Sequence, residues 1–350
     1  MDFISMLEWS VWKKLTDQEK TMVMNQVTMY FVSPLLKISD VRLEEHELFG
    51  IKSRTFSLKI NDEEFLLVPG NSEAILGWDL GVKGLPPFEI ISDQKNLRKL
   101  KLAVETEYDF SDLESIGQYI NDYTTPLRRV SVPPMLVQKY SLPAGTSYMG
   151  TLNMITGEFT GDIGSYNLFE TQIKNIIYPE LSAEESLSWS FPRSALKEEK
   201  FFMELTAGGE SYRIYRHHNW NYFEQEKVLN KYAFELLTED QWEFAVGAGT
   251  RRLFRWGNEL VFDESISRRM IQNQISLANM FGLVFDATKS RLELTRSPQV
   301  LKMDDYGEAF YPIVNMLPLA SYYHSGKALN PQEKLDPSKY LYRKAVIIEA

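Results

Sequence analysis

The sequence predicts an α+β protein in which much of the chain is irregular. A helical segment opens the chain, a β-hairpin follows it, and aromatic residues make up 13% of the 350 residues. Such an aromatic content is typical of folds whose loops are held in place by large rings. With 44% hydrophobic and 25% charged residues, the chain is able to form a sizeable core.

The opening helix is predicted within residues 1–38. Thr16 and Glu19 have the spacing of a capping box, and Pro34 ends the pattern. The residues expected on one helical face between them are Met22, Val23, Gln26, Val27, Tyr30 and Phe31.

A β-hairpin is predicted next. The segments "RTFSLKI" and "EEFLLVP" are rich in strand-forming residues and flank the turn residues "NDE". A further short strand follows within "VPGNSEAILGWD", after a glycine turn.

The remaining elements alternate between helix and strand. Ser111, with Glu114 three residues later, predicts a second helix cap. The segment "RRVSVPPMLVQKYSL" predicts strands, and "LYRKAVII" a final strand. Helices are expected near 165–177, 223–232 and 263–279, and strands near 281–286 and 291–295; residues 151–200 carry the weakest pattern.

The densest group of signals is "FELLTEDQWEFAVGAGTRRLFRWGN". Thr238 and Gln241 form a capping box, and Leu237 and Trp242 occupy the positions of a hydrophobic staple. A short, well-specified helix should therefore begin after Thr238, and Gly247 or Gly249 should end it.

Composition excludes several functions. The net charge of −10 makes nucleic acid an unfavourable partner, and the absence of cysteine excludes disulfides, thiolate nucleophiles and cysteine-ligated metals. The N-terminus lacks a secretory pattern and the most apolar early window is too short and polar to span a bilayer, so a cytoplasmic protein with no membrane partner is expected.

The segments "LLTEDQWEFA" and "FRWGN" resemble the "RLPTEAEWEYA … YPWGN" signature of the formylglycine-generating enzyme (sulfatase-modifying factor) family. Other segments follow in the family's order. "FLLVPGNSEAILGWD" resembles its "IPGG.F.MG" segment, "NMFGLVFDATKSRLEL" its "N.FGLYDMAGNVWEW" segment, and "LYRKAVII" its "GFRLV" strand. The segment "GAGTRRLFRWG" is similar to the corresponding segment in a bacterial branch of the family.

The resemblance implies a C-type-lectin-like fold over residues 61–350, with residues 1–60 as an extension of a helix and a β-hairpin. It also implies a set of scaffold residues: Thr238, Trp242, Glu243, Gly257, Asn279, Gly282 and Glu293.

The sequence departs from the family where the family's chemistry is done. The cysteine pair that binds copper in the family is absent, and Lys289 and Ser290 replace the Gly-Asn of its calcium loop. Glu235 and Leu237 replace the arginine and proline of "RLPT", and "LKMDDYGEAFYPIVNM" replaces the "GGSW" region. These departures indicate no catalytic residue, no metal and no cofactor.

The leading hypothesis is a non-catalytic family member that binds a small ligand or a protein in a bacterial cytoplasm. The candidate ligand cleft comprises Arg252, Arg255, Trp256, Asn258 and His324. Internal salt bridges of Arg251, Arg252 and Arg255 are favoured over an anion-binding role. Trp242 and Trp256 are interpreted as core anchors, and Glu243 as a buried hydrogen-bond acceptor.

Two alternatives stay open. One is an enzyme with a different, non-thiol chemistry that uses Glu243, Glu293 or His324. The other is a structural subunit whose helix docks a partner through an exposed apolar stripe on residues 16–33. His217 and His218 are adjacent, so on a strand they would point to opposite faces and would not ligate one metal. Asp304, Asp305 and Glu308 are interpreted as an acidic surface loop in preference to a calcium site.

Overall fold

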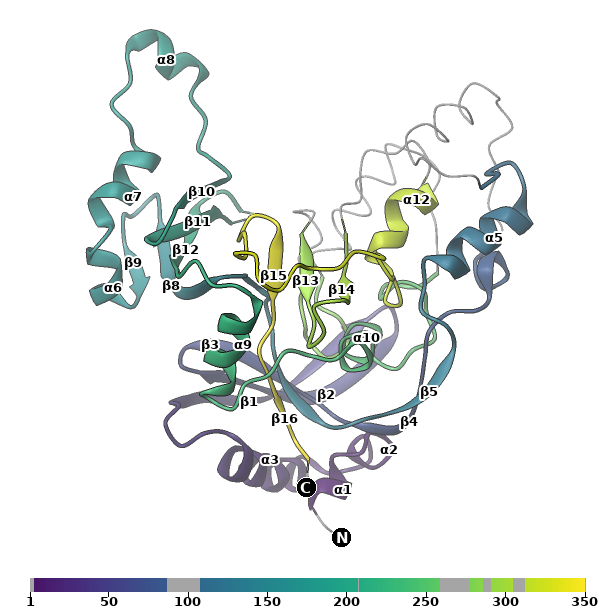
Figure 1. Cartoon of the computed structure of the whole chain (residues 1–350). Coiled ribbons are helices and arrows are strands. Elements are labelled where there is room, and N and C mark those ends of the chain that lie inside the picture. Colours follow the sequence, from purple (N-terminus) through teal and green to yellow (C-terminus); the bar gives the residue numbers. More distant parts are fainter. Residues whose placement is uncertain are drawn as a thin grey trace. The chain divides into compact units, whose positions relative to one another are not determined.

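The computed structural model describes residues 3–86, 108–206, 208–258, 277–285, 291–304 and 312–349. Its contacts divide the chain into two compact units (Figure 1). The first unit contains Met1–Ser141, Glu226–Asn330 and Tyr342–Ala350, and the second contains Leu142–Gln225 and Pro331–Leu341. Both are mixed units of helices and antiparallel sheets, as the predicted class requires.

The main sheet of the first unit has five antiparallel strands in the order β1-β2-β3-β6-β16. Its central strands β3 and β6 each bury four consecutive residues, because both faces of the sheet are covered there. The bounds are β1 (Ile38–Leu48), β2 (Ile51–Ile60), β3 (Glu63–Val68), β6 (Met135–Gln138) and β16 (Ala345–Ile347).

The predicted hairpin is confirmed as β2 and β3. Its turn residues, Asn61 and Asp62, have φ angles of 49° and 64°, which these two residue types tolerate well. Strands β1 and β2 fall within residues 1–60, the range expected to form an N-terminal extension. Instead, both strands continue the sheet that contains β3, since the hairpin pairs across that position.

Helix α3 (Asp17–Phe31) begins with the predicted capping box. The Thr16 backbone N–H donates to a Glu19 carboxylate oxygen at 2.8 Å, and the Glu19 N–H donates back to Thr16 Oγ1 at 3.3 Å. The helix has both buried and exposed apolar residues. Lys20, Val23, Met24 and Val27 are buried, whereas Met22, Met29 and Tyr30 are exposed. The shorter α1 (Phe3–Met6) and α2 (Trp9–Trp12) precede it.

Helix α5 (Leu113–Asp122) corrects a predicted cap. Asp112, not Ser111, accepts the capping hydrogen bond, from the Ser115 N–H at 2.9 Å. Ser111 instead donates to Asp109, because the chain forms a side-chain-bonded turn just before the helix. The neighbouring elements of the first unit are η1 (Gly81–Gly84) and the paired strands β4 (Asn71–Leu76) and β5 (Arg128–Val132).

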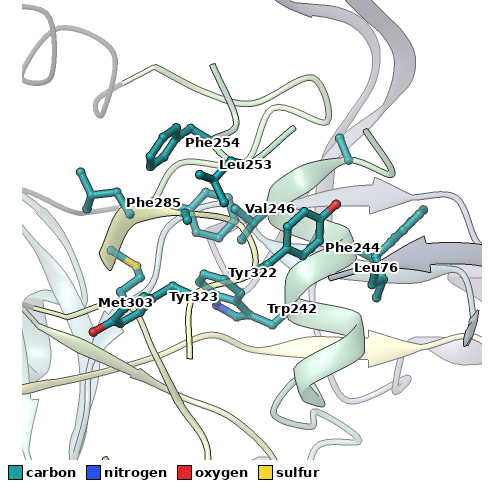
Figure 2. Packing of buried hydrophobic residues seen from close by; sticks show 14 of the residues in the cluster. Leu76, Trp242, Phe244, Val246, Leu253, Phe254, Phe285, Met303, Tyr322 and Tyr323 are labelled. Atoms are coloured by element: carbon teal, nitrogen blue, oxygen red, sulfur yellow. The ribbon is translucent and has the colours of Figure 1, made fainter. Parts of the chain in front are cut away.

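Helix α10 (Glu239–Gly247) lies in the largest hydrophobic core, among side chains from distant parts of the chain (Figure 2). All residues from Gln241 to Gly247 are buried, so the helix is enclosed on every side. Trp242, Phe244 and Val246 from this helix contribute to the cluster that contains Phe285 and Tyr322. The C-terminal elements of this unit are the paired strands β13 (Leu292–Leu294) and β14 (Leu301–Lys302), then α12 (Pro312–Met316) and η3 (Leu317–Leu319).

The second unit is built on the antiparallel sheet β10-β11-β12-β8-β9. Helices α6 (Ile163–Asn167) and α7 (Glu170–Ile177) contribute Tyr166, Ile173 and Ile177 to its separate core. The remaining bounds are β7 (Leu142–Pro143), β8 (Thr146–Asn153), β9 (Phe159–Gly161), α8 (Ala183–Ser188), β10 (Ser194–Lys197), β11 (Phe201–Leu205), β12 (Ser211–His217) and β15 (Tyr340–Tyr342). Along the chain, the boundary between the two units falls within α9 (Tyr222–Asn230), after Gln225.

Several predicted elements differ from the structure. The single helix expected at 165–177 is broken between α6 and α7, at Leu168 and Phe169. The final strand is two short strands, β15 and β16. Near 281–286 the chain forms one isolated bridge at Val284 instead of a strand. Most of the helix expected at 263–279 lies outside the described residues, as do Lys289, Ser290, Asp305 and Glu308.

Candidate functional site

The candidate site begins with the cap of α10. Thr238 Oγ1 accepts from the Gln241 N–H at 3.2 Å, and the Gln241 side chain accepts from the Thr238 N–H at 2.9 Å. The helix ends at Gly247, after which Ala248 adopts a left-handed conformation with φ 53°. The cap fixes the direction in which Trp242 and Glu243 leave the helix.

Glu243 is the centre of a buried polar network. Its side chain is fully buried and its carboxylate accepts from Thr125 Oγ1 at 2.8 Å, Arg128 Nη2 at 2.9 Å and Lys302 Nζ at 2.9 Å. These donors come from the loop after α5, from β5 and from β14. The predicted role of Glu243 as a buried acceptor that organises neighbouring segments is therefore confirmed.

The network extends to the first turn of α10. Lys302 Nζ, on a fully buried side chain, also donates to Glu239 Oε1 at 3.1 Å. Burial alone would raise the pKa of Glu239, but the nearby Lys302 ammonium outweighs it and the net pKa is lowered. Glu239 is therefore held ionised beside the helix N-terminus, where negative charge is stabilised.

The two tryptophans of the motif are core residues, as predicted. Trp242 is 2% exposed and lies 5.7 Å from Phe285 in an edge-to-face arrangement. Trp256 is 4% exposed and stacks on Phe254 with ring centroids 5.1 Å apart. The alternate spacing in "FRW" places these two rings on the same side of the chain.

Arg255 is buried between aromatic rings. Its guanidinium carbon lies 5.5 Å from the ring centroids of both Trp256 and Phe285, and Nη2 donates to the Phe285 carbonyl at 3.4 Å. Burial, together with the nearby Arg343, lowers the pKa of Arg255 to about 10. The rings offer the guanidinium a cation–π contact.

The other arginines lie nearer the surface. Arg251 Nη2 is 3.5 Å from Asp79, which confirms an internal salt bridge for this residue. Arg252 instead donates to the backbone carbonyl of Phe49 at 3.4 Å.

Gly257 and Asn258 shape the turn that follows Phe254 and Trp256. Asn258 Oδ1 accepts from the Leu253 N–H at 2.7 Å, and its amide donates to the Gly84 carbonyl at 2.9 Å. Gly257 has φ 135°, a conformation that L-residues rarely adopt. Asn258 is thus used to hold two loops together.

His324 does not share the contacts of Asn258. It is half-exposed, and Nδ1 lies 3.7 Å from Glu239 Oε1. Arg252, Asn258 and His324 therefore bond to three different segments, and their described contacts do not converge on one cleft.

Asn279 is a second hub, buried to 1% exposure. Its Oδ1 accepts from the N–H groups of Phe281 and Leu283, each at 3.0 Å. Its amide donates to the carbonyls of Ala245 and Val246. Asn279 thus joins its own loop to the last turn of α10.

Gly282 is required by conformation and by space. Its φ is 86°, and a Cβ placed there would lie 2.6 Å from His46 Cε1. We expect Gly282→Ala to lower the free energy of unfolding by about 2 kcal/mol, through backbone strain together with the clash. Urea unfolding measures this loss.

Gly326→Ala is the matched control for Gly282→Ala. Gly326 has φ 66° with nothing within 4 Å of its Cβ position, so only strain is introduced, at a cost of about 1 kcal/mol. Adding His46→Ala to Gly282→Ala should recover the steric part of the loss. Equal costs for the two glycine variants would contradict a tight contact at His46.

Glu293 forms a buried ion pair that the sequence analysis missed. Arg343 Nε donates to Glu293 Oε1 at 2.9 Å, and both side chains are almost fully buried. Arg343 Nη1 also donates to the carbonyls of Gln138 and Lys139. The arginine in "LYRKAVII" is one of two charged residues within an otherwise apolar strand pattern, which is the sequence signal that could have indicated a buried ion pair.

The paired histidines belong to the second unit and have separate partners. His217 Nδ1 accepts from the Glu199 N–H at 2.9 Å. His218 Nε2 lies 2.7 Å from Ser147 Oγ, and its ring stacks on Trp220 at 4.0 Å. These contacts tie β12 to β8 and to the turn before β11, and they agree with the prediction that the two side chains diverge.

Acid should weaken the second unit through His218. Burial, with smaller contributions from Arg216 and His217, lowers the pKa of His218 to about 4. Because the ordinary pKa is about 6.5, the unfolded chain binds this proton first, and the stabilisation present above pH 6.5 is lost as the pH falls towards 4. We expect a loss of about 1–2 kcal/mol between pH 7 and pH 5 from this residue.

His218→Gln provides the comparison for the acid effect, because glutamine can still bond to Ser147 but does not titrate. Urea-dependent hydrogen exchange of β8 and β12 peptides, with both proteins at each pH, isolates this contribution from that of the carboxylates. Identical pH dependence in the two proteins would contradict the role of His218.

No group of three His, Asp or Glu side chains in the described part of the chain is arranged to hold a metal ion. Asp304, from the acidic segment, is paired with Lys327 Nζ at 2.8 Å. Within the same described residues, no helix combines the length and the apolar character needed to cross a membrane.

Comparison with known families gives one match. Residues 147–216 match a family described as Profilin-like domain of unknown function (DUF7278). The matched segment runs from β8 into β12 and contains β9 to β11, so it is the sheet of the second unit. No curated protein matches the chain.

Proposed function

We propose that the chain is a cysteine-free, non-catalytic relative of the formylglycine-generating enzymes. In this proposal its first unit is a C-type-lectin-like framework that serves as a binding module. The proposal combines the motif resemblance with the structural use of the motif residues. The profilin-like match lies in the second unit, inside the range 61–350 that the resemblance assigns to one domain, and it gives the proposal no support.

One observation carries the proposal: the carboxylate of Glu243 is fully buried and already accepts hydrogen bonds from three side chains. A general base needs access to a substrate proton, which this carboxylate lacks. Asn279 and Glu293 are likewise buried and bonded inside the unit. The motif residues therefore support loops instead of presenting reactive atoms.

Oxidation of a sulfatase-type cysteine is the activity to test. Purified full-length chain would be incubated with copper and a peptide that carries this cysteine, and the peptide mass followed. We expect no conversion to formylglycine, because the chain has no cysteine with which to bind copper as the family does. Conversion above that of a copper-only control would refute the proposal.

The enzyme alternative is tested with the residues that it names. Glu243 and His324 belong to one cluster, because Lys302 Nζ bonds to both Glu243 and Glu239, and His324 Nδ1 lies 3.7 Å from Glu239. Glu293 pairs separately with Arg343. An activity that is lost in His324→Ala but retained in Arg252→Ala, with both variants folded, would favour the alternative over the binding module.

A further inference from the structure

The second unit carries an ordered arm between α7 and β10, here called the α8 arm (residues 178–191). Its base is fixed in three ways. The Tyr178 and Phe191 rings meet edge-to-face at 6.3 Å, Tyr178 Oη donates to the Met154 carbonyl, and Tyr212 Oη donates to the Pro192 carbonyl. Helix α8 stands at the far end of the arm (Figure 1).

The tip of the arm is also locally structured. Ser182 and Glu185 form a capping box, in which Ser182 N–H donates to Glu185 at 2.8 Å and Glu185 N–H donates to Ser182 Oγ at 3.3 Å. A capped helix on a pinned base holds its side chains in defined positions. The arm would therefore lose little conformational entropy when it binds a partner.

The arm exposes large apolar side chains. Leu187 is 89% exposed, and Leu181, Trp189 and Phe191 are between 36% and 43% exposed. Single exposed apolar residues are common, but here four occur within eleven residues of one arm. Exposed side chains such as Leu187 and Trp189 can act as anchors, which insert into a pocket on a binding partner.

The charge of the arm identifies the partner's chemistry. Glu180, Glu184 and Glu185 are exposed, and residues 175–192 contain no lysine, arginine or histidine. Phosphate-rich surfaces, both nucleic acids and anionic membranes, are therefore repelled. A second copy of the chain is also unfavourable, because the net charge of each copy is −10.

We propose that the α8 arm docks into an apolar groove, rimmed by lysine or arginine, on a protein partner. Leu187 and Trp189 are the apolar anchors, and Glu180 and Glu184 pair with the rim. Leu187 belongs to helix α8 and Trp189 follows at its C-cap, so both anchors stand at the far end of the arm. This surface lies in the second unit, so the inference does not rest on the family proposal.

The experiment uses the full chain and a defined probe, a leucine–lysine helical peptide with an apolar face rimmed by lysines. Binding is measured by calorimetry, with a leucine–glutamate peptide of equal length as the charge control. We expect the leucine–lysine peptide to bind, and Leu187→Ser and Trp189→Ser to weaken it about tenfold each. Glu180→Gln with Glu184→Gln should weaken binding and reduce its salt dependence.

Leu168→Ser is the matched control for the anchor variants. Leu168 is 70% exposed and lies between α6 and α7, outside the arm, so its replacement should leave binding within about twofold of wild type. Because Leu187 is almost fully exposed, Leu187→Ser removes no core contact, and circular dichroism verifies folding.

Three results would overturn the inference. The first is no binding of the leucine–lysine peptide, or binding that Leu187→Ser and Trp189→Ser leave unchanged. The second is a dimer in sedimentation experiments that Leu187→Ser abolishes, which would make a second copy the occupant. The third is arm-dependent binding to phosphatidylcholine vesicles, which would make the arm a lipid-binding element.

Discussion

Replacing Glu243 with alanine is expected to lower the free energy of unfolding by about 3–5 kcal/mol. The reason is that Lys302, whose side chain is fully buried, would lose its shortest carboxylate contact. Thr125 and Arg128 would lose an acceptor at the same time. Urea unfolding followed by tryptophan fluorescence reports mainly on this unit, since five of the seven tryptophans lie in it.

Two further variants separate the network from general effects. Glu235→Ala removes a solvent-exposed ion pair to Arg296, 3.0 Å long, and should cost no more than about 1 kcal/mol. Glu243→Leu combined with Lys302→Met should be more stable than Glu243→Ala, because the fully buried charge of Lys302, which loses its buried partner in Glu243→Ala, is removed as well. A cost for Glu243→Ala close to that of Glu235→Ala would disprove the central role of this network.

The Asn279→Ala variant should lose about 3–5 kcal/mol of stability. Four buried backbone groups would lose their partner, namely the N–H groups of Phe281 and Leu283 and the carbonyls of Ala245 and Val246. Each unsatisfied buried group costs about 1–3 kcal/mol, partly relieved by relaxation of the loop. Urea unfolding of the variant and of wild type gives the difference.

Asn258→Ala is the control for Asn279→Ala. Asn258 also bridges two loops, but among the described residues it makes two such bonds and is half-buried, so about 1–2 kcal/mol is expected. If the two asparagine variants lost the same stability, the loop of Asn279 would not be fixed by that side chain as described.

The sequence predicted those features of the fold that depend on residues close together in the chain. The capping boxes at Thr16 and Thr238 depend on residues three apart, and both form. The β2–β3 hairpin depends on its turn residues, and it forms at the predicted position. The second cap was misplaced by one residue because Ser111 and Asp112 both have capping side chains, and the carboxylate of Asp112 took the role.

The partners of the site residues were beyond such rules. Glu243 meets Arg128 and Lys302 across separations of 115 and 59 residues, and Glu293 meets Arg343 across 50. A sequence pattern within one helix or strand carries no information about such pairs. For the same reason, spacing in the sequence could not show whether the candidate cleft residues come together. Arg252, Asn258 and His324 do not lie on one helix or strand, and they contact different segments.

The role of α10 was predictable in kind but not in extent. The capping box and the two tryptophans indicated a short anchored helix. The burial of all its residues from Gln241 to Gly247 follows from long-range packing, which brings residues such as Phe285, Met303 and Tyr322 around it (Figure 2). Part of the sheet that matches the profilin-like family lies in residues 151–200, where the sequence pattern was weakest; its strands there, β9 and β10, have three and four residues.

Hydrogen–deuterium exchange of the motif segments tests the central claim most directly, namely that these residues are an internal framework. The amides of Phe281 and Leu283, bonded to Asn279, and that of Leu253, bonded to Asn258, are expected to exchange only slowly in wild type. Protection at Phe281 and Leu283 should fall in Asn279→Ala while that at Leu253 persists. Rapid exchange of all three amides in the wild-type protein would contradict the account.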